Sequence, residues 1–134
     1  MHKSRLQTLV IDCETDDLDG DAEFWGAVLG CRVLTRNAEP EDENYRGLEV
    51  DPSQPRMLVQ KVSHPSRVHL DIETDDIDAE VERLERLGAK KVEKVRYFWV
   101  LEAPSGHRFC VVPVQRPDFE EKANVWDGRN ENDA

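Results

Sequence analysis

The same acidic pattern occurs twice in this sequence, and that repeat constrains the fold more than any other feature. Residues 14–19 read Glu-Thr-Asp-Asp-Leu-Asp, and residues 73–78, which begin 59 positions later, read Glu-Thr-Asp-Asp-Ile-Asp. A further echo follows in the same order, because Asp-Pro-Ser-Gln-Pro-Arg at 51–56 is matched by Ala-Pro-Ser-Gly-His-Arg at 103–108. Echoes in a constant order indicate a duplicated supersecondary unit.

Each copy has the pattern of a strand followed by an amphipathic helix. In the second copy, alternate residues from Val68 to Ile72 are apolar, which is the period of a strand with one covered face. Thr74 or Asp75 can then cap a helix that ends at Gly88, a residue suited to the left-handed position after a helix. The apolar residues of that helix fall on one stripe: Ile77, Val81, Leu84 and Leu87.

Three strand-like segments follow each helix, so each copy is predicted to form a β-α-β-β-β unit. The segments lie near Arg32–Arg36, Tyr45–Val50 and Arg56–Val62 in copy one, and near Lys91–Val95, Tyr97–Glu102 and Arg108–Val114 in copy two. We therefore predict an α+β domain over residues 1–116, with unit one at 6–62 and unit two at 67–114. Residues 117–134 are predicted to be an acidic C-terminal tail, ordered only where Phe119 or Trp126 docks.

Charge and composition exclude several classes of function. The chain has 134 residues, enough for one domain, and 29 acidic against 18 basic residues give a net charge of -11, which would repel a nucleic-acid backbone. No apolar run approaches the roughly 18 residues of a membrane helix. The three cysteines lack CxxC spacing, which argues against a disulfide framework or a zinc ribbon. We expect a cytoplasmic protein with reduced thiols that binds neither nucleic acid nor membrane.

Several motifs together resemble the glyoxalase-like branch of the glyoxalase/bleomycin-resistance/dioxygenase superfamily, also called the vicinal oxygen chelate superfamily. They are Phe24-Trp25 with Val28-Leu29-Gly30, Val68-His69-Leu70-Asp71 leading to Leu87-Gly88-Ala89, and Pro104-Ser105-Gly106 before Phe109-Cys110-Val111. The resemblance covers residues 6–115. It implies two tandem β-α-β-β-β units that form a cleft between curved mixed half-sheets, and a homodimer.

The resemblance also implies where a metal would bind. Metalloenzymes of the superfamily place one ligand on the first and one on the last strand of each unit, which corresponds here to His69 and Cys110 in the second copy. The internal offsets then give Val10 and Leu58 in the first copy, and neither side chain can bind a metal. An alternative register would use Gln7 and Gln60, whose amide oxygens are weak ligands. We therefore expect no metal and no other cofactor; if a metal is present, His69 is its first ligand.

Other residues of the expected cleft have two interpretations each. Trp99 alternates on a strand that should border the cleft, where it could stack on a bound ring or pack in the core. Asp12 and Asp71 are a repeat pair that would favour a cationic or hydroxyl-rich ligand, or would simply end strands near solvent. Cys110 could be activated by His69, although its apolar strand is more typical of a packing role.

These patterns predict a protein that holds a small organic molecule between its two units without a catalytic metal. The expected ligand-binding residues are Val10, Leu58, Gln60, His69, Asp71, Trp99 and Cys110. The alternative is a metal-dependent lyase, isomerase or dioxygenase of the same superfamily. A third possibility is a vestigial cleft on a domain that serves as an interaction partner.

Overall fold

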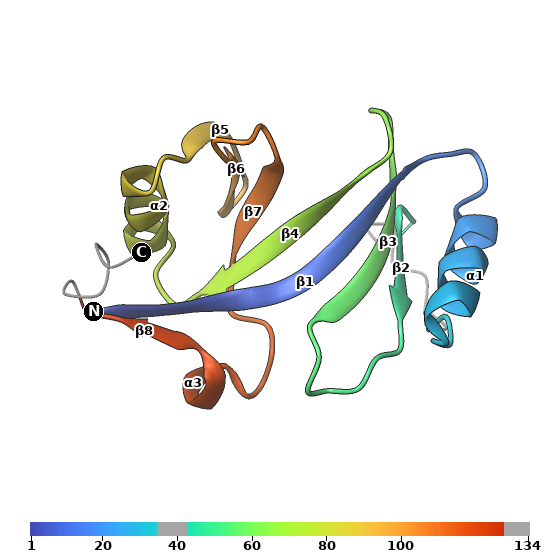
Figure 1. Cartoon of the computed structure of the whole chain (residues 1–134), viewed down its shortest axis with the longest axis horizontal. Coiled ribbons are helices and arrows are strands. Elements are labelled where there is room, and N and C mark those ends of the chain that lie inside the picture. Colours follow the sequence, from blue (N-terminus) through green and yellow to red (C-terminus); the bar gives the residue numbers. More distant parts are fainter. Residues whose placement is uncertain (35–42, 128–134) are drawn as a thin grey trace. The chain divides into compact units, whose positions relative to one another are not determined.

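The structure, a computed structural model, describes residues 1–34 and 43–127 and contains two compact units (Figure 1). The repeat-one unit is Thr8–His69, and the repeat-two unit combines Met1–Gln7 with Leu70–Ala134. Strands β1 (His2–Glu14) and β4 (Arg67–Thr74) therefore each contribute residues to both units. Strands make up most of the elements, with helices between them, and this confirms the predicted mixed α+β class.

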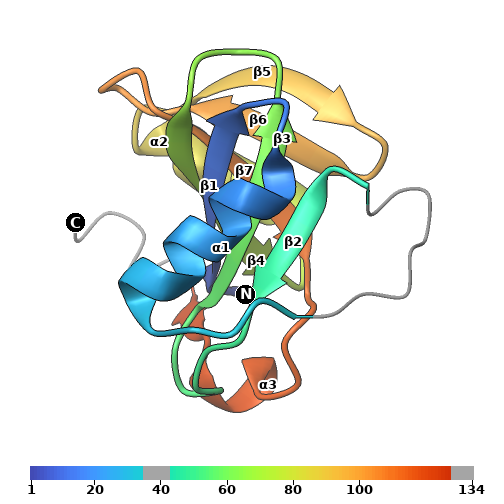
Figure 2. The ribbon, with the colours of Figure 1, turned by 90° about the vertical axis from the view of Figure 1, so that its right-hand side faces the viewer.

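The repeat-one unit has the strand order β2-β3-β1, with α1 (Leu18–Leu29) packed on one face (Figure 2). Strand β3 (Arg56–Val62) pairs in parallel with β1, and β2 (Tyr45–Leu48) pairs antiparallel with β3. Of the strand predicted at 32–36, the described part shows a single bridge from Val33 to Leu48, and residues 35 and 36 lie outside the described residues. The buried core under the helix consists of Ile11, Cys13, Leu18, Ala22, Leu48 and Val59.

Local capping explains where the two long helices begin and end. The Asp17 carboxylate accepts a hydrogen bond from the Gly20 N–H at 3.0 Å, and α1 ends at Gly30, whose φ is 69°. In α2 (Ile77–Arg86), the cap is Asp76, which accepts from the Ala79 N–H at 3.0 Å. The prediction of Thr74 or Asp75 as the cap was therefore wrong by one or two positions, because the helix begins one residue later and Asp76 is the carboxylate placed to reach its N–H groups.

The repeat-two unit has the strand order β4-β7-β6-β5, and α2 packs on it. Strand β7 (Arg108–Pro113) is parallel to β4, whereas β6 (Phe98–Glu102) and β5 (Lys90–Val95) continue the sheet antiparallel. Val81, Leu101 and Val111 form its buried core, with Trp99 and Phe109 packed against them. None of the helices in the described part of the chain is long and apolar enough to span a membrane.

The chain beyond residue 116 continues as packed structure. Helix α3 (Phe119–Lys122) and strand β8 (Asn124–Trp126) follow, and β8 pairs antiparallel with the start of β1. Phe119 is 1% exposed, and the Trp126 indole N–H donates to Ser4 Oγ at 2.8 Å. The Arg83 guanidinium stacks on the Trp126 ring, 3.8 Å from its centroid. Both aromatic residues proposed to dock the tail are thus in contact with the repeat-two unit, and residues 128–134 lie outside the described chain.

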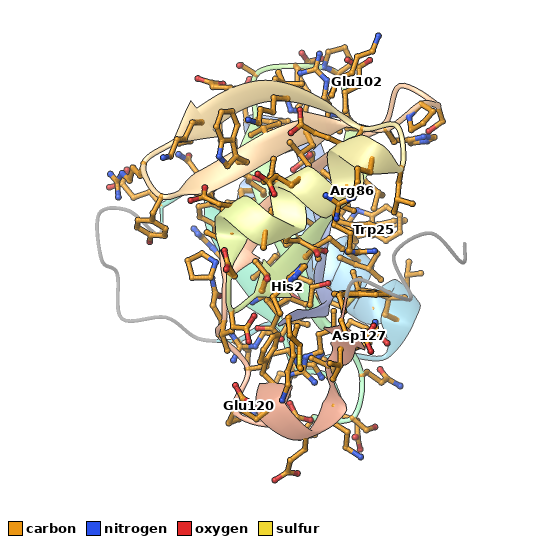
Figure 3. The ribbon with its side chains drawn as sticks, turned by 90° about the vertical axis from the view of Figure 1, so that its left-hand side faces the viewer. His2, Trp25, Arg86, Glu102, Glu120 and Asp127 are labelled. Carbon is orange, nitrogen blue, oxygen red and sulfur yellow. The ribbon has the colours of Figure 1, made fainter. Side chains whose placement is uncertain are left out.

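Two fully buried carboxylates, those of Glu73 and Glu80, bind residues near the start of the chain and near the end of β7. Glu73 accepts from Arg5 Nε at 2.7 Å and from the backbone N–H groups of Gln115 and Arg116. Glu80 accepts from both Arg83 Nε and Nη2 at 2.8 Å and is hydrogen-bonded to His2 Nε2, which lies beside α2 in Figure 3. Burial alone would raise the pKa of Glu80, but the hydrogen bonds from Arg83, His2 and Ser4 outweigh it and lower that pKa below 4.5.

We predict that Leu101→Ala lowers the free energy of unfolding by about 2–5 kcal/mol, because Leu101 is fully buried and its truncation leaves a cavity. Urea unfolding measures the change. The matched control is Leu87→Ala at the end of α2, where the side chain is 44% exposed and the loss should be small. Equal losses in the two variants would contradict the assignment of the core.

We also predict that the contribution of Glu80 to stability depends on pH. Its pKa is lower in the folded than in the unfolded chain, so the stabilisation is complete well above pH 4.5 and is lost as the pH falls through the folded-state pKa. Glu80→Gln should therefore destabilise the protein at pH 7, and the difference from wild type should shrink below pH 4.5. Unfolding curves from pH 7 to pH 3 measure this difference. A constant difference over that range would show that the charge of Glu80 is not what stabilises the fold.

Candidate functional site

Strand alternation divides the repeat-one sheet into a helix-covered face and a second face. Ile11 and Cys13 belong to the core under α1, so Val10 and Asp12 point to the opposite side. In the parallel register, Val10 is paired with Leu58 and Asp12 with Gln60. The predicted site residues Val10, Leu58 and Gln60 therefore share the face that α1 does not cover.

His69 and Asp12 form a short hydrogen bond on this face. His69 Nδ1 lies 2.6 Å from Asp12 Oδ2, and the side chains are 15% and 2% exposed. An ionised carboxylate only accepts hydrogen bonds, so Nδ1 carries the proton and donates it. The imidazole is thereby held in one orientation with Nε2 directed away from Asp12. His69 was predicted as a site residue, but nothing in the sequence indicated that Asp12 would bind it.

The neighbouring polar side chains of the same face are also engaged. Gln60 Nε2 donates to the Tyr45 hydroxyl at 3.1 Å, and Tyr45 is the register partner of Gln60 on β2. Gln7, the other residue of the alternative metal register, donates through Nε2 to Gln115 Oε1 at 2.8 Å. Cys13 lies on the helix-covered face, where burial, together with the charges of Asp21 and Asp12, raises the pKa of its thiol and makes it unreactive.

In the repeat-two sheet, Asp71 and Cys110 lie opposite α2. They are register partners on β4 and β7, and the next pair, Ile72 and Val111, places Val111 in the core under the helix. Trp99 is the register partner of Val111 on β6 and packs against that core, with Lys91 Nζ 5.0 Å from its ring centroid. Of the two interpretations of Trp99, the structure supports core packing, so we leave it out of the proposed site.

The two internal registers also locate the family's metal positions. Asp12 and Asp71 correspond by the repeat, and their strand partners are Gln60 and Cys110. The residue of the first copy that corresponds to Cys110 is therefore Gln60. The repeat offset had predicted Leu58, two residues earlier. The difference arises because the connection before β3 is longer than the turn before β7. The counterpart of His69 is still Val10, which cannot bind a metal. The family's four-ligand arrangement does not fit this chain.

A smaller set of potential ligands is nevertheless present on β4 and β7. His69 and Asp71 are two residues apart on one strand, and their ligand atoms and Cys110 Sγ lie within 4.8 Å of one another. Imidazole, carboxylate and thiolate are all zinc ligands. A metal-bound histidine commonly donates its second ring N–H to a carboxylate, as His69 does to Asp12. His69, Asp71 and Cys110 are thus the described residues best placed to hold an ion.

The sequence matches the model of the glyoxalase-like domain over residues 8–112. The chain belongs to the glyoxalase-like family. This places it in the vicinal oxygen chelate superfamily, as its motifs predicted. None of the proteins of curated function matches the sequence.

Solved structures share the fold of this glyoxalase-like protein at low identity. A hypothetical protein from Bacillus halodurans is 11% identical, with a TM-score of 0.60 over 84% of this chain and 95% of that one. A methylmalonyl-CoA epimerase from Streptomyces coelicolor in complex with 2-nitronate-propionyl-CoA is 17% identical, with a TM-score of 0.57 over 81% and 96%. A Mn(II)-bound glyoxalase from Novosphingobium aromaticivorans is 15% identical, with a TM-score of 0.57 over 84% and 40%. At these identities the likeness shows the fold alone.

We predict that His69→Ala destabilises the protein by about 1–3 kcal/mol, since it leaves the buried Asp12 carboxylate without its hydrogen-bond donor. Replacing both residues, in His69→Ala with Asp12→Ala, should recover much of that loss because no charge is then stranded. Urea unfolding of the wild type, both single variants and the double variant measures the coupling between the two residues. Additive losses would mean that the 2.6 Å contact contributes nothing.

Proposed function

We propose that this glyoxalase-like protein binds a small organic molecule, without a catalytic metal, against the face that carries Val10, Leu58, Gln60 and His69. The observation that supports this most is the Asp12–His69 hydrogen bond beside the apolar Val10–Leu58 pair. Small-molecule sites combine an apolar wall with a few fixed polar groups that orient the ligand. Asp71 and Cys110, which the sequence also predicted as ligand-binding residues, lie on the helix-free face of the repeat-two sheet.

The arrangement assigns a role to each part of this face. Leu58 offers its methyl groups to an apolar portion of the ligand, the buried Val10 packs beside it, and the orientation of His69 is fixed by its bond to Asp12. Gln60 is held by Tyr45, so its carbonyl oxygen is presented in a fixed direction. Leu58, Gln60 and His69 are half-buried, which leaves part of each side chain for a ligand to contact. Such a site binds and orients a molecule.

The structural neighbours support a small-molecule function in general terms. One is described as an epimerase with a coenzyme A derivative bound and another as a Mn(II)-bound glyoxalase. We carry over only the class, a protein that binds a small organic molecule, because the ligand-bearing positions differ here. A homodimer and a cytoplasmic location, both expected from the sequence, stay predictions, and light scattering of the purified protein tests the first.

The metal-free part of the proposal predicts that Zn²⁺, Ni²⁺, Mn²⁺ or Fe²⁺ at modest excess leaves the melting temperature unchanged. An ion that binds only the folded state stabilises it by about 2.7 kcal/mol at 100 times its Kd, which is several degrees for a domain of this size. Differential scanning fluorimetry with each ion, before and after chelation, measures the shift. No ion should produce lyase or dioxygenase activity.

The second candidate function is a metal-dependent lyase, isomerase or dioxygenase, and the group of His69, Asp71 and Cys110 favours it. A rise of several degrees with one particular ion, abolished in Cys110→Ala, would establish this alternative and contradict the metal-free proposal. Cys110→Ala is the sharper variant because Cys110, unlike His69, is not bound to a buried carboxylate. Its own melting temperature without metal serves as the control.

A further inference from the structure

The carboxylate of Asp12 has an oxygen that the protein itself does not satisfy. Asp12 is 2% exposed, and its Oδ2 is bound to His69 Nδ1 at 2.6 Å. Its Oδ1 is buried and has no hydrogen-bond partner among the described residues. Glu73 and Glu80, the two fully buried glutamates, are by contrast each held by several donors.

We infer that the ligand of the proposed site presents a hydrogen-bond donor, preferably an amine, to Oδ1 of Asp12. The inference rests on the small-molecule function proposed above and names the class of molecule. Buried polar atoms in native proteins are almost always hydrogen-bonded, and an ionised carboxylate that loses its hydration needs a donor in return. Since the described chain supplies a donor to only one oxygen, we assign the donor for the other oxygen to the bound molecule.

The position of Asp12 makes such a contact feasible. Its side chain points away from α1, on the face where Leu58, Gln60 and His69 are half-buried. A ligand that rests its apolar part on Leu58 therefore lies next to the strand position that holds the carboxylate, because Leu58 is two residues from Gln60, the register partner of Asp12, and shares its face. The face thus offers an apolar surface and a buried acceptor side by side.

The charge of this acceptor selects among ligands. An ionised carboxylate accepts hydrogen bonds only, so an ammonium or amide N–H fits it and another carboxylate is repelled. Hydrogen bonds that include an ionised partner are about twice as strong as neutral ones. An amine should therefore bind better than a neutral alcohol of the same shape, and both should bind better than an acid.

Three probes of similar shape test the inference on the full chain: benzylamine, benzyl alcohol and phenylacetate. Titration followed by ¹H–¹⁵N NMR gives a Kd for each from the amides of residues 10–13, 58–60 and 69. Benzylamine should shift these amides and bind at least about tenfold more tightly than phenylacetate, the factor expected of one charge-assisted hydrogen bond.

The variant Asp12→Asn gives a second test, because it replaces the hydrogen-bond acceptor Oδ1 with an NH₂ donor. His69 Nδ1–H still has an amide oxygen to bind, and the NH₂ group then occupies the place of the free acceptor. Benzylamine should bind about tenfold more weakly to this variant, and phenylacetate should bind more tightly. Glu23→Gln on the exposed side of α1 removes the same charge and should change neither Kd.

The outcomes separate the inference from the proposed function. If phenylacetate binds the wild type as tightly as benzylamine at these amides, the face binds small molecules but the assignment of a donor is wrong. Unchanged affinity in a folded Asp12→Asn variant has the same meaning. If none of the three probes shifts these amides, a water molecule alone satisfies Asp12 and the inference is overturned. The small-molecule function itself fails only if a wider screen of fragments also leaves them unshifted.

Discussion

Alternation of side chains along the strands is the constraint on which both the core and the site depend. In each unit a helix covers one face of the sheet, so every second strand residue is committed to packing. Ile11 and Val59 meet α1, and Val111 meets α2, which leaves Asp12, Gln60 and Cys110 on the opposite faces. A shift of register by one residue would exchange the two sets and put a carboxylate into the core.

The buried carboxylates differ in the number of hydrogen-bond donors that surround them. Glu73 and Glu80 are fully buried, and each is surrounded by arginine, histidine or backbone donors, which is how a folded protein stabilises an ionised group away from water. These contacts fix the start of β1 and the C-terminal segment to α2. Asp12 is buried to nearly the same degree, but the described residues supply it with one donor, His69. That difference is the physical basis for assigning structural roles to the glutamates and a ligand-binding role to Asp12.

The sequence was sufficient for the parts of the fold that depend on local pattern. The acidic repeat, the glycines at 30 and 88 and the alternation in Val68–Ile72 predicted the element order, because each is a short-range signal. The N-cap of α2 was predicted one or two residues too early. Thr74, Asp75 and Asp76 are adjacent, and residues of all three types can accept a hydrogen bond from the N–H groups at the start of a helix. The packing of residues 118–126 could not be predicted, because it depends on Ser4, Arg5 and Arg83, which are distant in sequence.

The site was predictable as a set of positions, but the interactions among them were not. The repeat offset paired Asp12 with Asp71, yet the bond between Asp12 and His69 joins residues 57 positions apart and leaves no trace in spacing. The offset of 52 for the last strand also misplaced the counterpart of Cys110 by two residues, since loop length does not follow the repeat. Trp99 had the alternation of a strand, but only the register with Val111 shows which face it occupies.

The central claim is that Asp12 holds His69 in position to contact an organic ligand. The protonation of the two His69 ring nitrogens tests this claim most directly. Long-range ¹H–¹⁵N NMR reports the two ring nitrogens separately. We predict a protonated Nδ1, lost as a fixed state in Asp12→Ala, and an Nε2 signal that equimolar Zn²⁺ does not move. An Nε2 that shifts to the position of a metal-bound nitrogen, or an Nδ1 that carries no proton, would contradict it.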